Sequence, residues 1–243
     1  MTVLDSRSEM PRDRDDMEET DGAGVLITDE GVSMPTVEDI GAGRGPSWLD
    51  EWLTRNALDV VAWYRHIHAN PELSRREFNT TELVAGILSA AGLRPKLFDS
   101  GTGLICDVGT GGRCVALRAD MDALPITELT GLPYASTVPG AAHACGHDAH
   151  TAMLIAAGLA LAAAPELPGR VRLVFQPAEE VMPGGALDVI AAGGLDGVDS
   201  IFGLHCDPRV QVGNVGTRVG AITSATDLLE LRLTSPGGHT SRP

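Results

Sequence analysis

The chain has 243 residues, of which 43% are hydrophobic and 4% aromatic, and its formal net charge is −15. The length is enough for one large domain or two small ones. The acidic balance and the lack of a basic stripe argue against a nucleic acid partner. No run of 18 apolar residues and no signal peptide pattern is present, which argues against a membrane protein. The four cysteines form no dense disulfide framework, so we expect a cytoplasmic protein with free thiols.

The first 46 residues differ from the rest of the chain. They hold 12 acidic and 4 basic residues, few large apolar residues and no periodic pattern. We therefore predict a disordered acidic tail over 1–46. Order is expected to begin at Ser47, where apolar residues recur at helical spacing until Pro71.

Helical and strand patterns then follow one another. Helices are predicted over 79–91 and 151–164, and apolar strands over 104–108, 114–119 and 171–175. A Gly-Thr-Gly-Gly sequence joins the first two strands and predicts a hairpin. The alternation of strands and helices predicts an α/β fold with a largely parallel sheet.

Residues 143–150, with the sequence HACGHDAH, carry an unusual density of metal-binding side chains. Three histidines, a cysteine and an aspartate occur within eight residues, just before an apolar helix. A thiolate and imidazoles at this spacing suit a divalent metal ion. The alternative for this octet alone is a polar loop with one buried cysteine.

Further candidate ligands lie where strands end. Asp120 and Asp122 follow one strand, Glu179 and Glu180 follow another, and His205 follows a third. Each group alone has a plain structural explanation, such as an acidic turn or a helix cap. Ligands converge beyond the carboxyl ends of parallel strands, however, so the coincidence predicts a metal site.

The last residues begin another pattern. Strands are predicted over 211–219 and 228–234, and the second alternates apolar and polar residues as a half-exposed strand does. We expect a new domain to start near Ser224. Since one strand cannot form a domain, the sequence looks truncated at its C-terminus.

Six motifs together resemble the M20 metallopeptidase family, in its amidohydrolase branch of hippurate hydrolases, N-acyl-L-amino-acid amidohydrolases and auxin-conjugate hydrolases. The motifs are RHIHANPELSRRE at 65–77, ALRADMDALPITE at 116–128, HACGHDAHTAM at 143–153, FQPAEE at 175–180, GLH at 203–205 and SPGGHTSRP at 235–243. The resemblance covers residues 47–243. It implies that 47–223 form the N-terminal part of a metallohydrolase catalytic domain. It also implies that 224–243 begin an α+β lid that often mediates homodimerisation.

The resemblance also implies roles for individual residues. It makes Glu179 the general base, Asp122 an aspartate that orients the centre, and His239 a lid histidine that polarises the substrate carbonyl. The implied ligands of two divalent ions (zinc, manganese, cobalt or nickel) are Cys145, His147, Glu180 and His205. The expected reaction is hydrolysis of the amide bond of a small N-acyl amino acid.

Other functions remain open at this point. A dipeptidase of the same family would use the same centre, and the family pattern includes a further histidine ligand that this sequence lacks. An inactive fragment of such an enzyme is therefore the second alternative. A purely structural zinc site explains less, because closed four-ligand sites need no general base such as Glu179.

Overall fold

The computed structural model describes residues 27–28, 31–32, 46–217, 219–222, 229–234 and 237–238. Its helices are α2 (Ser47–Ala69), α3 (Phe78–Ala90), α4 (His147–Ala162) and α5 (Ala186–Ala191). Its strands are β1 (Ile27–Thr28), β2 (Gly31–Val32), β3 (Lys96–Leu97), β4 (Leu104–Gly109), β5 (Cys114–Asp120), β6 (Arg170–Gln176) and β7 (Ser200–Gly203). Within the described residues, no helix is long and apolar enough to cross a membrane.

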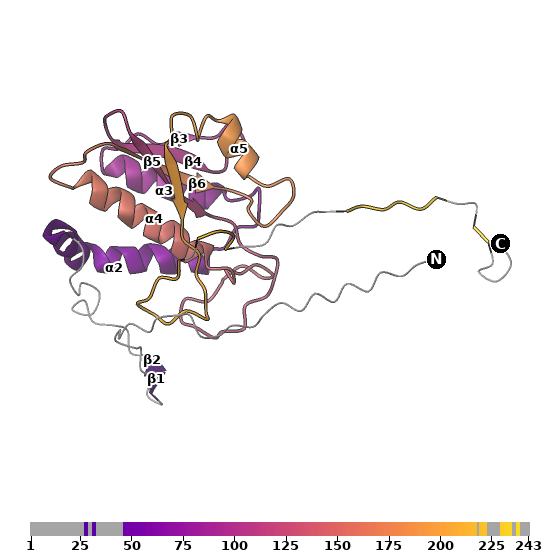
Figure 1. The fold of residues 1–243 in the computed structure, drawn as a ribbon. Coiled ribbons are helices and arrows are strands. Elements are labelled where there is room, and N and C mark those ends of the chain that lie inside the picture. The colour runs from indigo at the N-terminus through magenta and orange to yellow at the C-terminus, as the bar shows by residue number, and fades with distance from the viewer. Residues whose placement is uncertain are drawn as a thin grey trace.

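The main sheet has five strands in the order β3-β4-β6-β5-β7, and helices cover it (Figure 1). The predicted α/β fold is confirmed, but the sheet is mixed, because two of its four described strand pairings are antiparallel. Strand β5 runs parallel to both β6 and β7, whereas β4 runs antiparallel to β3 and β6. The parallel strands are those that lead into the predicted ligands.

The predicted hairpin between β4 and β5 is wrong, because β6 lies between these strands. Leu173 of β6 is the register partner of Cys106 on one side and of Leu117 on the other. Strand β6, which is buried from Arg172 to Gln176, thus pairs along both edges in the middle of the sheet, which a local turn pattern does not reveal. The connecting loop instead passes the start of β6, where the Arg170 N–H donates to the Arg113 carbonyl.

Two apolar clusters hold helices on the sheet. The larger one joins α3 and α4 to one face, with Leu88 and Ile155 packed near Leu104 and Phe175. The smaller one joins α5 to the sheet through Val189. Helix α2 lies along α4, outside that layer (Figure 1). Burial of α4 between the sheet and α2 explains its nearly unbroken apolar sequence.

At the ends of the chain, some predictions are contradicted and others fall on residues that the structure does not describe. The described residues within 211–219 and 228–234 form no strand, which contradicts both predicted strands. Their apolar side chains are exposed, and no strand of the described chain pairs with them, so the alternating pattern has no partner to stabilise it. In the predicted tail, β1 and β2 form a short antiparallel pair, and the other residues of 1–45 lie outside the described residues. The domain boundaries at 46 and 223 remain predictions.

Candidate metal centre

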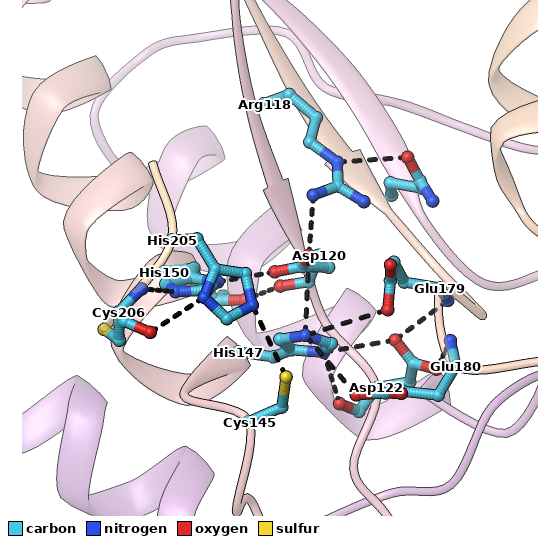
Figure 2. A network of polar contacts seen from close by, with 12 residues as sticks. Arg118, Asp120, Asp122, Cys145, His147, His150, Glu179, Glu180, His205 and Cys206 are labelled. Carbon is cyan, nitrogen blue, oxygen red and sulfur yellow. Dashed lines mark hydrogen bonds and ion pairs between the residues drawn. The ribbon is translucent and has the colours of Figure 1, made fainter. Parts of the chain in front are cut away.

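The candidate centre lies where β5, β6 and β7 end and α4 begins (Figure 2). The parallel register of these strands brings their carboxyl ends to one edge of the sheet. Gly146, with a left-handed φ of 88°, directly precedes α4 and turns the chain so that His147 is the first residue of the helix. A Cβ at Gly146 would lie 3.0 Å from the Cβ of Cys206, so the close approach of the two loops also favours glycine here.

Five predicted residues form two groups that share His147. Its Nε2 lies 3.7 Å from Glu180 Oε1 and 4.0 Å from Glu179 Oε2, and these three residues form one group. Cys145, His147 and His205 form the other, with Cys145 Sγ 3.5 Å from His205 Nε2. Figure 2 shows the two carboxylates on one side of His147, with the cysteine and the second histidine around the rest of the ring.

The hydrogen bonding of His147 turns one ring nitrogen toward these groups. Its Nδ1 lies 2.8 Å from the Asp122 carbonyl oxygen, which can only accept a hydrogen bond. Nδ1 therefore carries a proton, so Nε2 is the nitrogen that offers a lone pair in the neutral imidazole, and it faces the carboxylates. A hydrogen bond from one ring nitrogen to a backbone carbonyl is a usual way to orient a histidine whose other nitrogen binds a metal.

The electrostatics of the centre suit a cation. Glu180 Oε1 is buried and has no hydrogen-bond partner among the described residues. Burial and the nearby charges of Glu180 and Asp120 raise the pKa of Glu179. Burial and Glu180 likewise raise the pKa of Cys145 to about 12. The thiol, imidazole and carboxylate donors fit divalent ions such as zinc, and a bound cation would favour the thiolate and carboxylate forms.

Asp122 holds the backbone of the glutamate pair. Its Oδ1 accepts the Glu179 N–H and its Oδ2 accepts the Glu180 N–H, both at 3.0 Å, and the Ser74 hydroxyl donates to Oδ2 at 2.5 Å. Burial alone would raise the pKa of Asp122, but contacts with His147, Ser74 and these N–H groups lower it to about 2. Asp122 thus lies where it can orient the centre. His239, the remaining predicted site residue, lies outside the described residues.

Two further residues support the centre: His150, one of the three histidines of the octet, and Asp120, which the sequence offered as a candidate ligand. His150 accepts the Cys206 N–H on Nε2 at 2.9 Å, so its Nδ1 carries the proton and meets Asp120 Oδ1 at 2.6 Å. Asp120 also accepts from Arg118 at 2.6 Å. Both nitrogens of His150 are therefore occupied, although it lies close enough to His147 and Asp120 to form a third possible ligand group. The three-residue spacing of His147 and His150 on a helix was the available signal.

A second buried cluster lies behind the centre. His68 Nδ1 contacts Asp148 Oδ2 at 2.6 Å, and its Nε2 contacts Glu128 Oε1 at 3.1 Å. His68 lies in the last turn of α2. The structure shows that it ties α2 to the start of α4, next to His147, and to the loop that contains Glu128. Tyr134 from that loop packs against its ring.

Comparisons with known proteins identify relatives of this chain. Residues 116–239 match the family described as Peptidase family M20/M25/M40. A Rhodococcus jostii protein named for a glutamate–cysteine ligase is 58% identical over 82% of this chain and 26% of its own length. The N-acetyl-L-cysteine deacetylase of Bacillus subtilis is 44% identical over 76% of this chain and 45% of its own.

A solved structure shows the same similarity. The YXEP protein of Bacillus subtilis, described as a dinuclear metal-binding peptidase of the M20 family, has a TM-score of 0.59 and 42% identity. The match covers 65% of this chain and 44% of that one. This chain thus spans less than half the length of these relatives. The family match covers just over half of the chain and includes the residues around His147, so the chain belongs to peptidase family M20/M25/M40.

Proposed function

We propose that the protein is a metal-dependent amidohydrolase that cleaves the amide bond of N-acyl amino acids. The observation that carries this proposal is the pair of ligand groups that share His147, one of which includes Glu179. The similarity to an N-acetyl-L-cysteine deacetylase supports the substrate class. The proposed activity is that of the whole protein. This chain supplies the residues of the centre that the structure describes.

The residues that would hold two divalent ions are Cys145, His147, Glu180 and His205. Zinc, manganese, cobalt and nickel all suit this mixture of sulfur, nitrogen and oxygen donors. When bound, such ions make a water molecule more acidic and polarise a carbonyl group. The thiol of Cys145 gives up its proton to serve as a ligand.

Glu179 is suited to act as general base. Its side chain is 41% exposed, so it can reach both water and substrate. The pKa of Glu179 is raised toward neutral pH, which suits a general base that must first take a proton and then release it. In this proposal it takes the proton of the attacking water and passes it to the leaving amine. Its backbone meanwhile stays fixed by Asp122.

The remaining expectations extend the proposal beyond the described residues. His239 would polarise the substrate carbonyl, and 224–243 would begin a lid through which two copies associate. Residues 47–223 would form the N-terminal part of the catalytic domain. The four cysteines are free, which supports a reducing compartment such as the cytoplasm.

The first test is metal content of the purified chain after dialysis against zinc or manganese, beside the double variant Cys145→Ser/His147→Ala. About two ions per chain, lost in the double variant, are expected. Retention of no metal by the wild-type chain would contradict a centre in this chain and favour the incomplete fragment.

The second test is hydrolysis of N-acetyl-L-cysteine, N-benzoylglycine and a dipeptide by the metal-loaded chain. Glu179→Gln should keep its metal and lose turnover by ~10²-fold or more. Near-normal turnover by this variant would contradict the role of Glu179. Turnover of the dipeptide alone would favour the dipeptidase.

A further inference from the structure

We propose that Glu77 is a positioning residue that fixes the base loop, defined here as residues 177–185, through the backbone of Ala178. This inference rests on the proposed function, because Glu179 and Glu180 belong to that loop. Glu77 is fully buried at the start of α3, 101 residues before Ala178. Its Oε1 accepts the Ala178 N–H at 2.7 Å.

Two carboxylates from different parts of the chain hold three successive backbone N–H groups of the base loop. Glu77 takes the N–H of Ala178, and Asp122 takes those of Glu179 and Glu180. The Ala178 carbonyl accepts the Gly185 N–H at 2.9 Å, which closes the base loop on itself. The direction of the two glutamate side chains therefore depends on both carboxylates, and only Asp122 was expected to have such a role.

The backbone of Ala178 explains why an anchor is needed there. Ala178 has a φ of +48° and Arg75 has a φ of +69°, and these are the only non-glycine residues with positive φ in the described chain. A side chain with a Cβ disfavours this conformation, which persists only where its surroundings impose it. Glu77 Oε1 accepts the N–H groups of both residues, since the Arg75 N–H lies 3.1 Å away. One oxygen thus stabilises two left-handed residues on opposite sides of the contact.

The segment around Glu77 also holds the far end of the base loop. The Arg75 guanidinium donates to the Pro183 carbonyl at 2.8 Å and pairs with Asp188 of α5. Ser74 donates to Asp122. The segment ELSRRE at 72–77 has no role in the proposed mechanism. Its contacts instead fix the position of the residues that would surround the metal.

Variants can separate this role from a contribution to stability alone. Glu77→Ala removes the acceptor, Glu77→Asp shortens its reach, and Glu77→Gln keeps an accepting oxygen. Glu72→Ala is a matched control on the same segment. The Glu72 carboxylate accepts the N–H groups of Asn79 and Thr80 in α3, and it makes no hydrogen bond to the base loop among the described contacts.

The first readout is hydrogen exchange at the amides of Ala178, Glu179 and Glu180 in the metal-free protein. Protection should fall at least tenfold in Glu77→Ala and Glu77→Asp, and stay within about threefold of wild type in Glu77→Gln. Glu72→Ala should lose protection in α3 and keep it in the base loop. Unchanged protection at Ala178 in Glu77→Asp, or a loss in Glu77→Gln equal to that in Glu77→Ala, would overturn the proposal.

The second readout is the visible spectrum of the cobalt-loaded protein, which reports the ligand geometry around the ion and needs no turnover. Glu77→Ala and Glu77→Asp should alter the d–d bands and weaken cobalt binding about tenfold. Glu77→Gln should restore both. If exchange and spectra follow this pattern while no amide substrate is cleaved, the proposed reaction fails and the positioning role stands.

Discussion

The Asp122 carboxylate holds the backbone of Glu179 and leaves the Glu179 side chain free, because Asp122 Oδ1 accepts the Glu179 N–H at 3.0 Å. The other carboxylate oxygen holds Glu180 in the same way. The two glutamate carboxylates are thereby left free to face His147. Asp122 itself is buried, so neither oxygen has water to replace a lost partner.

We expect Asp122→Asn to weaken both folding and metal binding. The new amide NH₂ would face a backbone N–H where an oxygen now accepts. The free energy of unfolding should fall by ~2 kcal/mol, since a buried donor loses its acceptor. Zinc affinity should fall ~10-fold or more, because the ligand-bearing loop loses an anchor. Denaturant titration and chelator competition measure the two effects.

Asp199→Asn is the matched control for this variant. Asp199 Oδ2 accepts the Cys114 N–H at 2.8 Å, at the end of β5 opposite the centre. Asp199 is exposed, so water can replace the lost acceptor, and Asp199→Asn should cost less stability than Asp122→Asn and keep its zinc affinity. If zinc affinity falls equally in both variants, the effect of Asp122 is only a loss of folded protein.

A second prediction concerns the backbone beside His205. His150 accepts the Cys206 N–H, so it fixes the residue that follows this proposed ligand. We expect His150→Ala to reduce zinc affinity about tenfold while all four proposed ligands remain. The exposed helical residue His66 offers the control, since His66→Ala removes a histidine without such a bond. Isothermal titration with zinc should separate the two, and equal affinities would refute a supporting role for His150.

A third prediction concerns pH and His68. Burial lowers the pKa of His68, but its bonds to Asp148 and Glu128 outweigh burial and raise it above the ordinary value. A raised pKa means that the folded protein holds the proton more tightly than the unfolded chain. The stabilisation is complete below the unfolded pKa of about 6.5 and is lost as pH rises through the folded pKa.

The free energy of unfolding should therefore fall more steeply with rising pH above about 6.5 in wild type than in His68→Gln. Glutamine keeps a polar side chain and does not titrate, so the difference between the two curves isolates His68. The variant should be less stable at pH 6 by ~3 kcal/mol, because two carboxylates lose a buried cationic partner. Parallel curves over pH 6–9 would contradict a protonated His68.

The sequence was sufficient to predict the candidate ligands because their placement depends on local signals. Apolar strands and the start of an apolar helix can be recognised from a few residues each, and parallel strands bring their ends together. Cys145, His147, Glu179 and His205 could thus be grouped although up to 60 residues separate them.

The supports of the centre could not be predicted in this way. Glu77 contacts Ala178 because the turn at Arg75 lies against the turn at Ala178, and neither left-handed residue is a glycine that would reveal its turn in the sequence. His150 and Asp120 looked like further ligands until their partners were known. The position of β6 between β4 and β5 likewise depends on tertiary pairing, which overrode a good turn sequence.

A last prediction tests how α4 packs against the sheet. A Cβ added at Gly158 of α4 would lie 2.3 Å from Leu173 Cδ1, and Leu173 is fully buried in β6. A leucine in a packed core has little room to move, so Gly158→Ala should destabilise the protein by ~1–3 kcal/mol despite the higher helix propensity of alanine.

Gly86 of α3 provides the opposite case. A Cβ there would meet no atom within 4 Å, so Gly86→Ala should gain up to ~1 kcal/mol from helix propensity alone. Thermal and denaturant unfolding of the two variants should therefore shift in opposite directions from wild type. A gain of stability in both would mean that α4 can move away from β6, and the start of that helix would then hold His147 less firmly than the packing indicates.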